Sequence, residues 1–100
     1  MRLNDNDIKA IKNVAKAVFG ETAIIWLFGS RTDDHKKGGD IDLFINNVNE
    51  TTLTLEAKIR FLTELKIKIG DRKIDVVFDN ANTRQKKNFY HSILRQKVKL

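Results

Sequence analysis

Two short apolar runs, separated by a polar stretch, constrain the fold of this chain more than any other feature of its sequence. The first, "TAIIWLF" at residues 22–28, is rich in β-branched and aromatic side chains and predicts a buried strand. The second, "DIDLFI" at residues 40–45, alternates acidic or aromatic side chains with aliphatic ones and predicts a second strand. This strand carries Asp40 and Asp42 on one face. Two unpaired carboxylates are unfavourable in a core, so they require another explanation.

The rest of the sequence shows the periodicity of helices. Apolar spacing predicts a first helix over residues 8–19, with Asp5 or Asp7 as its N-cap and Gly20 as its stop. A second amphipathic helix is expected over residues 53–69. Its inward face is expected to consist of Leu55, Ile59, Leu62, Leu65 and Ile69.

The C-terminal third predicts one more strand and one more helix. "KIDVVF" at residues 73–78 is a third strand, and residues 84–96 form a last helix with Phe89, Ile93 and either Tyr90 or Leu94 facing inward. This order implies the α/β (α+β) class, with a small mixed β-sheet and helices packed on one face. A length of 100 residues suits one compact domain, so we expect residues 1–100 to form a single domain.

Composition excludes several classes of protein. No apolar run approaches the roughly 20 residues of a membrane-spanning helix. The N-terminus lacks the apolar core of a secretory signal, and we expect a cytoplasmic protein without a membrane partner. The absence of cysteine excludes a disulfide framework and thiolate chemistry. Residues 76–100 carry six Lys or Arg and one acid. This basic segment can contact RNA, an acidic protein or only water. Because the sequence shows no recognised RNA-binding module, a nucleic-acid partner is not favoured.

The acidic pair points to a metal. Asp40 and Asp42 are two residues apart on a strand, so their side chains leave the same face about 7 Å apart along it. Two like charges in one small volume are unfavourable unless a cation or a proton lies between them. Oxygen ligands suit Mg²⁺ or Mn²⁺, and Mg²⁺ often takes its remaining ligands from substrate phosphates.

The turn after the first strand supplies groups that bind phosphate. Gly29 lets the backbone turn sharply and approach a ligand, and Ser30 offers a hydroxyl and an N–H to an anion. Arg31 adds a guanidinium suited to phosphate oxygens. Asp75 is the acid of the third strand, and it would bring a third carboxylate to the site if that strand pairs beside residues 40–45.

Taken singly, each of these features has an ordinary structural explanation. A Gly-Ser pair is often only a turn, an Asp-x-Asp pair is often a solvated edge or a structural cation site, and a lone strand aspartate usually faces water. In this order along the chain they indicate two-metal nucleotidyl transfer. Asp40 and Asp42 would bridge both ions, while Asp75 would hold the ion on the nucleophile and act as its base.

The string "LFGSRTDDHKKGGDIDLFI" resembles the signature of the DNA polymerase β nucleotidyltransferase superfamily, and the short chain resembles its minimal nucleotidyltransferase (MNT) branch. The likeness covers residues 23–78, the catalytic palm, and the ending "SILRQKVKL" is also similar. It implies that Gly29 and Ser30 bind the triphosphate of ATP or another NTP. It also implies that Asp40, Asp42 and Asp75 hold two Mg²⁺ ions, with Mn²⁺ as a substitute.

The resemblance also implies a partner. MNT proteins typically pair with a HEPN-fold helical protein in a hetero-oligomer, and in several pairs the MNT protein is an antitoxin that transfers AMP from ATP to a tyrosine of its toxin. The expected activity is therefore that of a protein adenylyltransferase. The sequence departs from the family pattern at Asp33 and Asp34, where small or neutral residues are commoner, and at Gly39, where many relatives have serine.

Three functions therefore stand side by side. The first is an enzyme that transfers an NMP, with AMP favoured, to a hydroxyl of a protein partner. The second is a non-catalytic antitoxin that neutralises a HEPN partner by forming a complex with it. The third, a small-molecule transferase, normally needs an extra helical domain or a dimer to form its acceptor pocket. All three carboxylates are present in the sequence, which favours the enzyme.

Overall fold

The computed structural model describes residues 3–29 and 40–100. Along the chain its elements are α1 (Asp5–Phe19), β1 (Ile24–Phe28), β2 (Ile41–Asn46), a 3₁₀ turn η2 (Glu50–Thr52), α2 (Leu55–Ile69), β3 (Ile74–Phe78), α3 (Ala81–Gln85), α4 (Lys87–Gln96) and β4 (Val98–Lys99). The strands form one sheet in the order β3-β2-β1-β4, in which β2 and β3 are parallel and the other pairs antiparallel. The predicted small mixed sheet is therefore confirmed, whereas the short strand β4 was not predicted. None of the helices in the described residues is long and apolar enough to cross a membrane.

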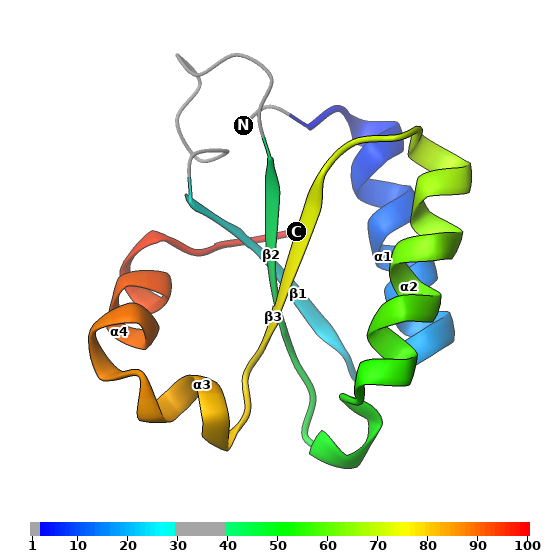
Figure 1. Ribbon diagram of the computed structural model, residues 1–100. Helices are drawn as coiled ribbons and strands as arrows, with labels where there is room; N and C mark the ends of the chain where they lie inside the picture. The colour runs from blue at the N-terminus through cyan, green and yellow to red at the C-terminus, as the bar shows by residue number, and fades with distance from the viewer. Residues whose placement is uncertain (1–2, 30–39) are drawn as a thin grey trace.

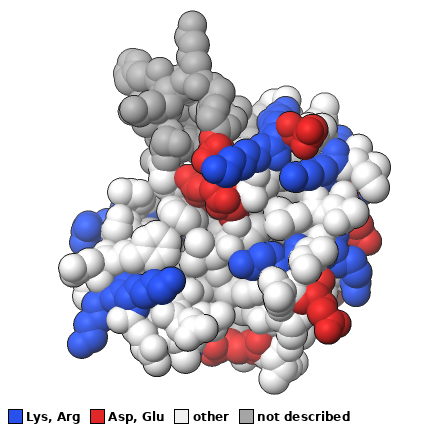
Figure 2. Space-filling model, in the orientation of Figure 1, with Lys and Arg blue, Asp and Glu red and all other residues white. Residues whose placement is uncertain are grey.

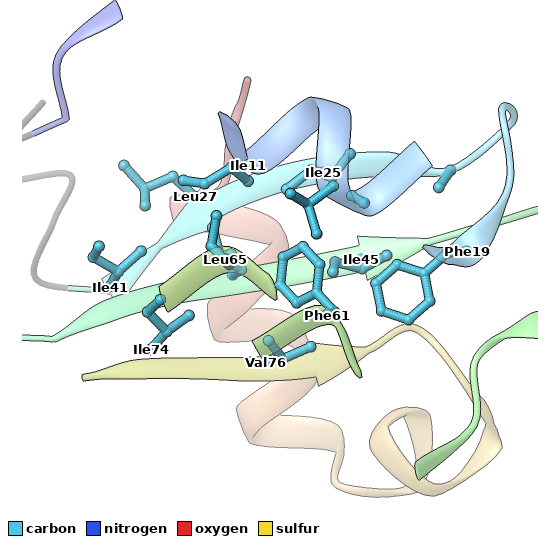
Figure 3. Packing of buried hydrophobic residues seen from close by; sticks show 14 of the residues in the cluster. Ile11, Phe19, Ile25, Leu27, Ile41, Ile45, Phe61, Leu65, Ile74 and Val76 are labelled. Carbon is cyan, nitrogen blue, oxygen red and sulfur yellow. The ribbon is translucent and has the colours of Figure 1, made fainter. Parts of the chain in front are cut away.

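The main core lies between the sheet and the helix pair α1 and α2, which cover one face of the sheet (Figure 1). Because side chains alternate along a strand, every second residue of β1, β2 and β3 points into this layer. These residues are Ile25, Leu27, Ile41, Leu43, Ile45, Ile74, Val76 and Phe78. Phe19 of α1 packs against Phe61 of α2, with ring centroids 5.3 Å apart (Figure 3). The Phe19 ring also packs against Phe78 of β3, at 5.5 Å.

The ends of α1 are fixed by side chains close to those predicted. Asn4, rather than Asp5 or Asp7, is the N-cap, and its Oδ1 accepts a hydrogen bond from the Asp7 N–H at 2.8 Å. The Asp7 carboxylate is instead buried in an ion pair with Arg72, at 2.9 Å, which ties the start of α1 to the turn before β3. Gly20 ends the helix, as predicted.

The inward face of α2 was predicted in part: Leu65 is buried and Leu62 and Ile69 pack partly buried against the core, but Phe61 was missed. Phe61 and Leu65 are fully buried, while Leu55 and Ile59 are 69% and 56% exposed. Residues two apart on an α-helix are separated by about 200° around its axis, so burying Phe61 places Ile59 on nearly the opposite side. The prediction followed a long stripe of aliphatic residues and overlooked the larger aromatic side chain, which gains more from burial.

The opposite face of the sheet is covered in part by α4. Ile93 of α4 faces inward, as predicted, and forms a second and smaller apolar cluster with Phe28 and Phe44. The last helix is broken at Lys86 into α3 and α4, and Phe89 is 43% exposed rather than inward. The helices predicted on one face are thus joined by α4 on the other, and no helix of residues 3–29 or 40–100 covers the upper part of that second face (Figure 1).

Candidate functional site

Two of the predicted carboxylates face each other across neighbouring strands. Asp42 of β2 and Asp75 of β3 are directly paired in the parallel register, and Phe28 of β1 pairs with Asp42 on its other side. Since Ile41 and Leu43 point into the main core, Asp42 points to the second face of the sheet. Figure 2 shows Asp and Glu side chains gathered near the upper end of the strands. The expectation that the third strand brings Asp75 beside residues 40–45 is confirmed by this register.

The proximity of these acids changes the ionisation of Asp42. Burial is the first cause that raises the pKa of Asp42, followed by the charges of Asp75 and Asp40 and by a hydrogen bond with the Asp75 side chain. The charge of Lys73 acts in the opposite direction. Three carboxylates therefore share one local electrostatic environment, and Lys73 offsets their mutual repulsion only in part.

Asp40 is placed by the start of β3. The Ile41 N–H donates a hydrogen bond to the Lys73 carbonyl at 3.0 Å, so the residues before β2 and β3 lie side by side. The Lys73 Nζ forms an ion pair with the Asp40 carboxylate at 3.5 Å, and both side chains remain in contact with solvent. Lys73 is the residue of this site that sequence reasoning missed. Its position two residues before Asp75, on the same side of an extended chain, was the available signal.

Gly29 is required by both its backbone and its surroundings. Its φ is +73°, a left-handed conformation that a residue with a Cβ adopts only at a cost. A Cβ added at Gly29 would overlap the Oδ2 of Asp42 and lie 3.2 Å from its Cγ. The end of β1 therefore forms the wall against which the Asp42 carboxylate rests. Ser30 and Arg31, the other predicted phosphate ligands, lie outside the described residues, as do Asp33, Asp34 and Gly39.

The chemistry of the donors fits a hard divalent cation. Carboxylate oxygens are the ligands that Mg²⁺ and Mn²⁺ prefer, and a cation between Asp42 and Asp75 would relieve the repulsion that raises the pKa of Asp42. Within residues 3–29 and 40–100, no three Asp, Glu, His or Cys side chains are already arranged as a metal-binding group. The Asp40 carboxylate is instead paired with Lys73, so it would have to exchange this partner to join Asp42 and Asp75.

Replacement of Gly29 by alanine is expected to disturb the site and to lower stability. The left-handed backbone alone costs about 1–2 kcal/mol, and the new Cβ must push the Asp42 side chain aside. We expect a lower free energy of unfolding in urea and a loss of Mg²⁺ affinity measured by calorimetry. Gly70→Ala is the matched control, since Gly70 also has a positive φ, of 92°, but has open space where its Cβ would lie. Equal Mg²⁺ affinity in the two variants would contradict the role given to Gly29.

Replacement of Asp42 by asparagine is expected to raise the free energy of unfolding at neutral pH. The pKa of Asp42 in the folded protein lies above its ordinary value of 3.8. At a pH between 3.8 and this raised pKa, the folded state therefore binds more protons than the unfolded state. Wild-type stability therefore falls as the pH rises through this interval, whereas the variant lacks this loss. The advantage of the variant should be absent below about pH 3.8, where both states of the wild type are protonated.

Thermal unfolding of both proteins across this pH range measures the difference. Added Mg²⁺ should raise the melting temperature of the wild type more than that of the variant, because the cation restores favourable surroundings for the carboxylates. An Asp42→Asn variant that is less stable than the wild type at pH 7 would show that the charge of Asp42 stabilises the fold.

A mixed sheet with carboxylates paired on two parallel strands, beside a glycine at the end of a third, defines a nucleotidyltransferase palm. The chain belongs to the polymerase beta nucleotidyltransferase family, whose model matches residues 9–100. The prediction of this superfamily from the Gly-Ser and Asp-x-Asp motif is therefore confirmed. No curated protein matches the sequence of this chain.

A solved structure of similar fold belongs to a mutant of the toxin-antitoxin MntA-HpeT. The likeness has a TM-score of 0.67 and covers 97% of this chain and 71% of that one, with 21% sequence identity. At 21% sequence identity, the comparison shows a similar fold and nothing about function. It agrees with the polymerase β-like architecture predicted from the sequence.

Proposed function

We propose that this protein is a Mg²⁺-dependent nucleotidyltransferase that transfers an NMP, with AMP from ATP favoured, to a hydroxyl of a protein partner. The observation that carries the proposal is the register of β2 and β3, which sets Asp42 opposite Asp75. Membership of the polymerase beta nucleotidyltransferase family supports the general reaction. We further propose that the partner is a HEPN-family toxin and that this chain is its antitoxin.

Each residue of the site has a proposed task. Asp40, Asp42 and Asp75 would hold the metal, which supplies positive charge to the phosphates and lowers the pKa of the attacking hydroxyl. Asp75 is exposed and takes the proton of the acceptor hydroxyl. The oxygen of that hydroxyl bonds to the α-phosphorus as the bond to pyrophosphate breaks and pyrophosphate leaves. Gly29 keeps Asp42 in place and lets phosphate approach the backbone, and the next residue, Ser30, would bind the triphosphate.

Lys73 has a proposed part in the resting state. Its ion pair with Asp40 supplies one positive charge to the acidic group when the nucleotide and its cation are absent. The same contact supports a second candidate function, a non-catalytic antitoxin, because it neutralises one of the three carboxylates within the chain itself. The two candidates differ in whether the carboxylates must be free to bind a cation.

The partner and the acceptor are proposed from two sources. The fold is similar to that of a structure of the toxin-antitoxin MntA-HpeT. The resemblance of the sequence to the MNT branch implies a helical HEPN protein as the partner. The face of the sheet around Asp42 and Asp75 is bounded by the short helices α3 and α4 only at its lower end, so the described part of this chain leaves room for a second protein to present its hydroxyl (Figure 1).

Transfer of label from ATP to the partner tests the proposal. Purified protein is mixed with the helical product of the neighbouring gene, Mg²⁺ and ATP labelled at the α-phosphate, and parallel reactions contain the other three nucleotides. Labelling of the partner by the wild type and not by Asp42→Asn supports the enzyme. If both proteins neutralise the partner equally and neither labels it, the binding-only antitoxin is the correct reading.

A further inference from the structure

The outer edge of β3 lies in a groove that the proposed chemistry does not use. β3 is the last strand of the sheet within the described residues. A groove of about 370 Å³ runs along it and is lined by three consecutive residues of the strand, Val76, Val77 and Phe78. Since consecutive side chains point to opposite faces, a groove that contacts all three meets the strand at its edge. Its volume is within the ~300–1,000 Å³ of ligand sites.

The backbone of β3 offers hydrogen-bonding groups to this groove. The Lys73 carbonyl accepts from Ile41, and the Asp79 N–H donates to Ile45, so the odd-numbered residues of β3 bond to β2. The N–H and C=O groups of the even-numbered residues therefore point outward. At Val76, in the middle of the strand, no strand of the described residues pairs with them. An exposed strand edge of this kind is a template for one more strand.

The walls of the groove carry positive charge and no acid. Lys58 of α2 stands on one side, with its Nζ 5.2 Å from the centre of the Phe78 ring. Lys86 and the half-exposed ring of Phe89 stand on the other side, next to α3 and α4. Figure 2 shows Lys and Arg side chains on both sides of a mostly uncharged central strip, with acidic side chains at its upper and lower ends. A ligand along β3 therefore meets a lysine on each side.

We propose that this groove binds an extended, acidic peptide segment of a partner protein, which adds to the sheet along β3. The main chain of the segment pairs with the outward groups of Val76, its acidic side chains meet Lys58 and Lys86, and an apolar side chain contacts Phe89. Val76 directly follows Asp75, so a segment bound here extends to the carboxylates within about one residue, or ~3.3 Å. The inference deepens the proposed function and rests on it only for the idea that the segment delivers the acceptor hydroxyl.

Peptide binding tests the groove without requiring catalysis. The probe is a fluorescein-labelled peptide of eight residues in which pairs of glutamates alternate with pairs of valines, so that its extended form carries glutamate on both faces. Fluorescence anisotropy measures its affinity. Reversal of both charges in Lys58→Glu/Lys86→Glu should weaken binding about tenfold or more, about 1.4 kcal/mol. The control Lys9→Glu/Lys66→Glu makes the same change of charge on exposed lysines of α1 and α2 that do not line the groove, and it should bind as the wild type does.

A modified probe keeps the test decisive even if the charge-reversed protein folds poorly. The same peptide methylated at every backbone nitrogen keeps its charges but has no N–H to donate, so it should not bind the wild type. Equal binding of the methylated peptide, or tighter binding of a single-stranded oligonucleotide, overturns the inference. Formation of a dimer through this edge, seen by sedimentation and abolished by Lys58→Glu/Lys86→Glu, overturns it as well.

The outcome is separable from that of the proposed function. Asp42→Asn should bind the peptide as the wild type does, because Asp42 does not line the groove. Peptide binding without label transfer would support the peptide-binding groove and contradict the nucleotidyltransferase activity. Label transfer by a protein that does not bind the peptide would support the activity and contradict the groove.

Discussion

Replacement of Asp75 by asparagine is expected to lower the rate of nucleotidyl transfer by about 10³-fold or more, which corresponds to about 4 kcal/mol of transition-state stabilisation. Asp75 is exposed and lies opposite Asp42 on the neighbouring strand. The amide keeps the size of the side chain but can neither accept a proton nor balance the charge of a cation. Initial rates of label transfer at saturating ATP and Mg²⁺ measure the effect.

The control for this substitution is Asp71→Asn. Asp71 is exposed and precedes the same strand, but it does not influence the ionisation of Asp42. We expect Asp71→Asn to keep the wild-type rate. Asp75→Asn should be folded and no less stable than the wild type, since the Asp75 charge is one of the causes that raise the pKa of Asp42. A variant that keeps more than a tenth of the wild-type rate would remove Asp75 from the catalytic group.

Truncation of Phe61 to alanine is expected to have the largest effect on stability, about 3–5 kcal/mol. The Phe61 ring is fully buried and packs 5.3 Å, centre to centre, from Phe19, at the point where α1, α2 and the sheet meet. Removing it opens a cavity that rigid strands and helices close only in part. The loss is a large fraction of the roughly 5–15 kcal/mol that stabilises a typical domain, and urea unfolding at constant slope measures it.

A residue of the same helix serves as the control. Ile67 of α2 is 80% exposed, so Ile67→Ala should change the free energy of unfolding by no more than about 0.5 kcal/mol. The pair of variants also tests the corrected orientation of α2. If the two substitutions cost the same, the helix does not turn its Phe61 side to the core.

Several elements of the fold could be predicted because their causes are local. The positions of the three longer strands follow from β-branched runs and from the alternation of residues 40–45. Gly20 and Gly70 end α1 and α2, and each adopts a positive φ that other residues avoid. Such features depend on the preferences of a few adjacent residues, which a sequence displays directly.

Other features depend on competition between elements and could not be predicted. The two-residue strand β4 is too short to show a pattern, and it exists because Val98 and Lys99 pair with β1. The inward face of α2 was predicted only in part, because several apolar stripes compete on that helix. Packing against Phe19 selects the side with Phe61 and Leu65 and leaves Leu55 and Ile59 exposed. Phe89 stays half exposed because Ile93 and Tyr90 already fill the space under α4.

By itself, the sequence determined the chemical groups and their family. The glycine that ends the first strand, the pair Asp40 and Asp42 and the acid of the third strand are local patterns, and they were enough to indicate a nucleotidyltransferase. Only the tertiary structure decided how these groups meet. The parallel register that sets Asp42 opposite Asp75, and the ion pair of Asp40 with Lys73, depend on which side chains of separate strands are buried together. A shift by one residue would turn every side chain of β3 to the other face, so the main core holds the carboxylates in line.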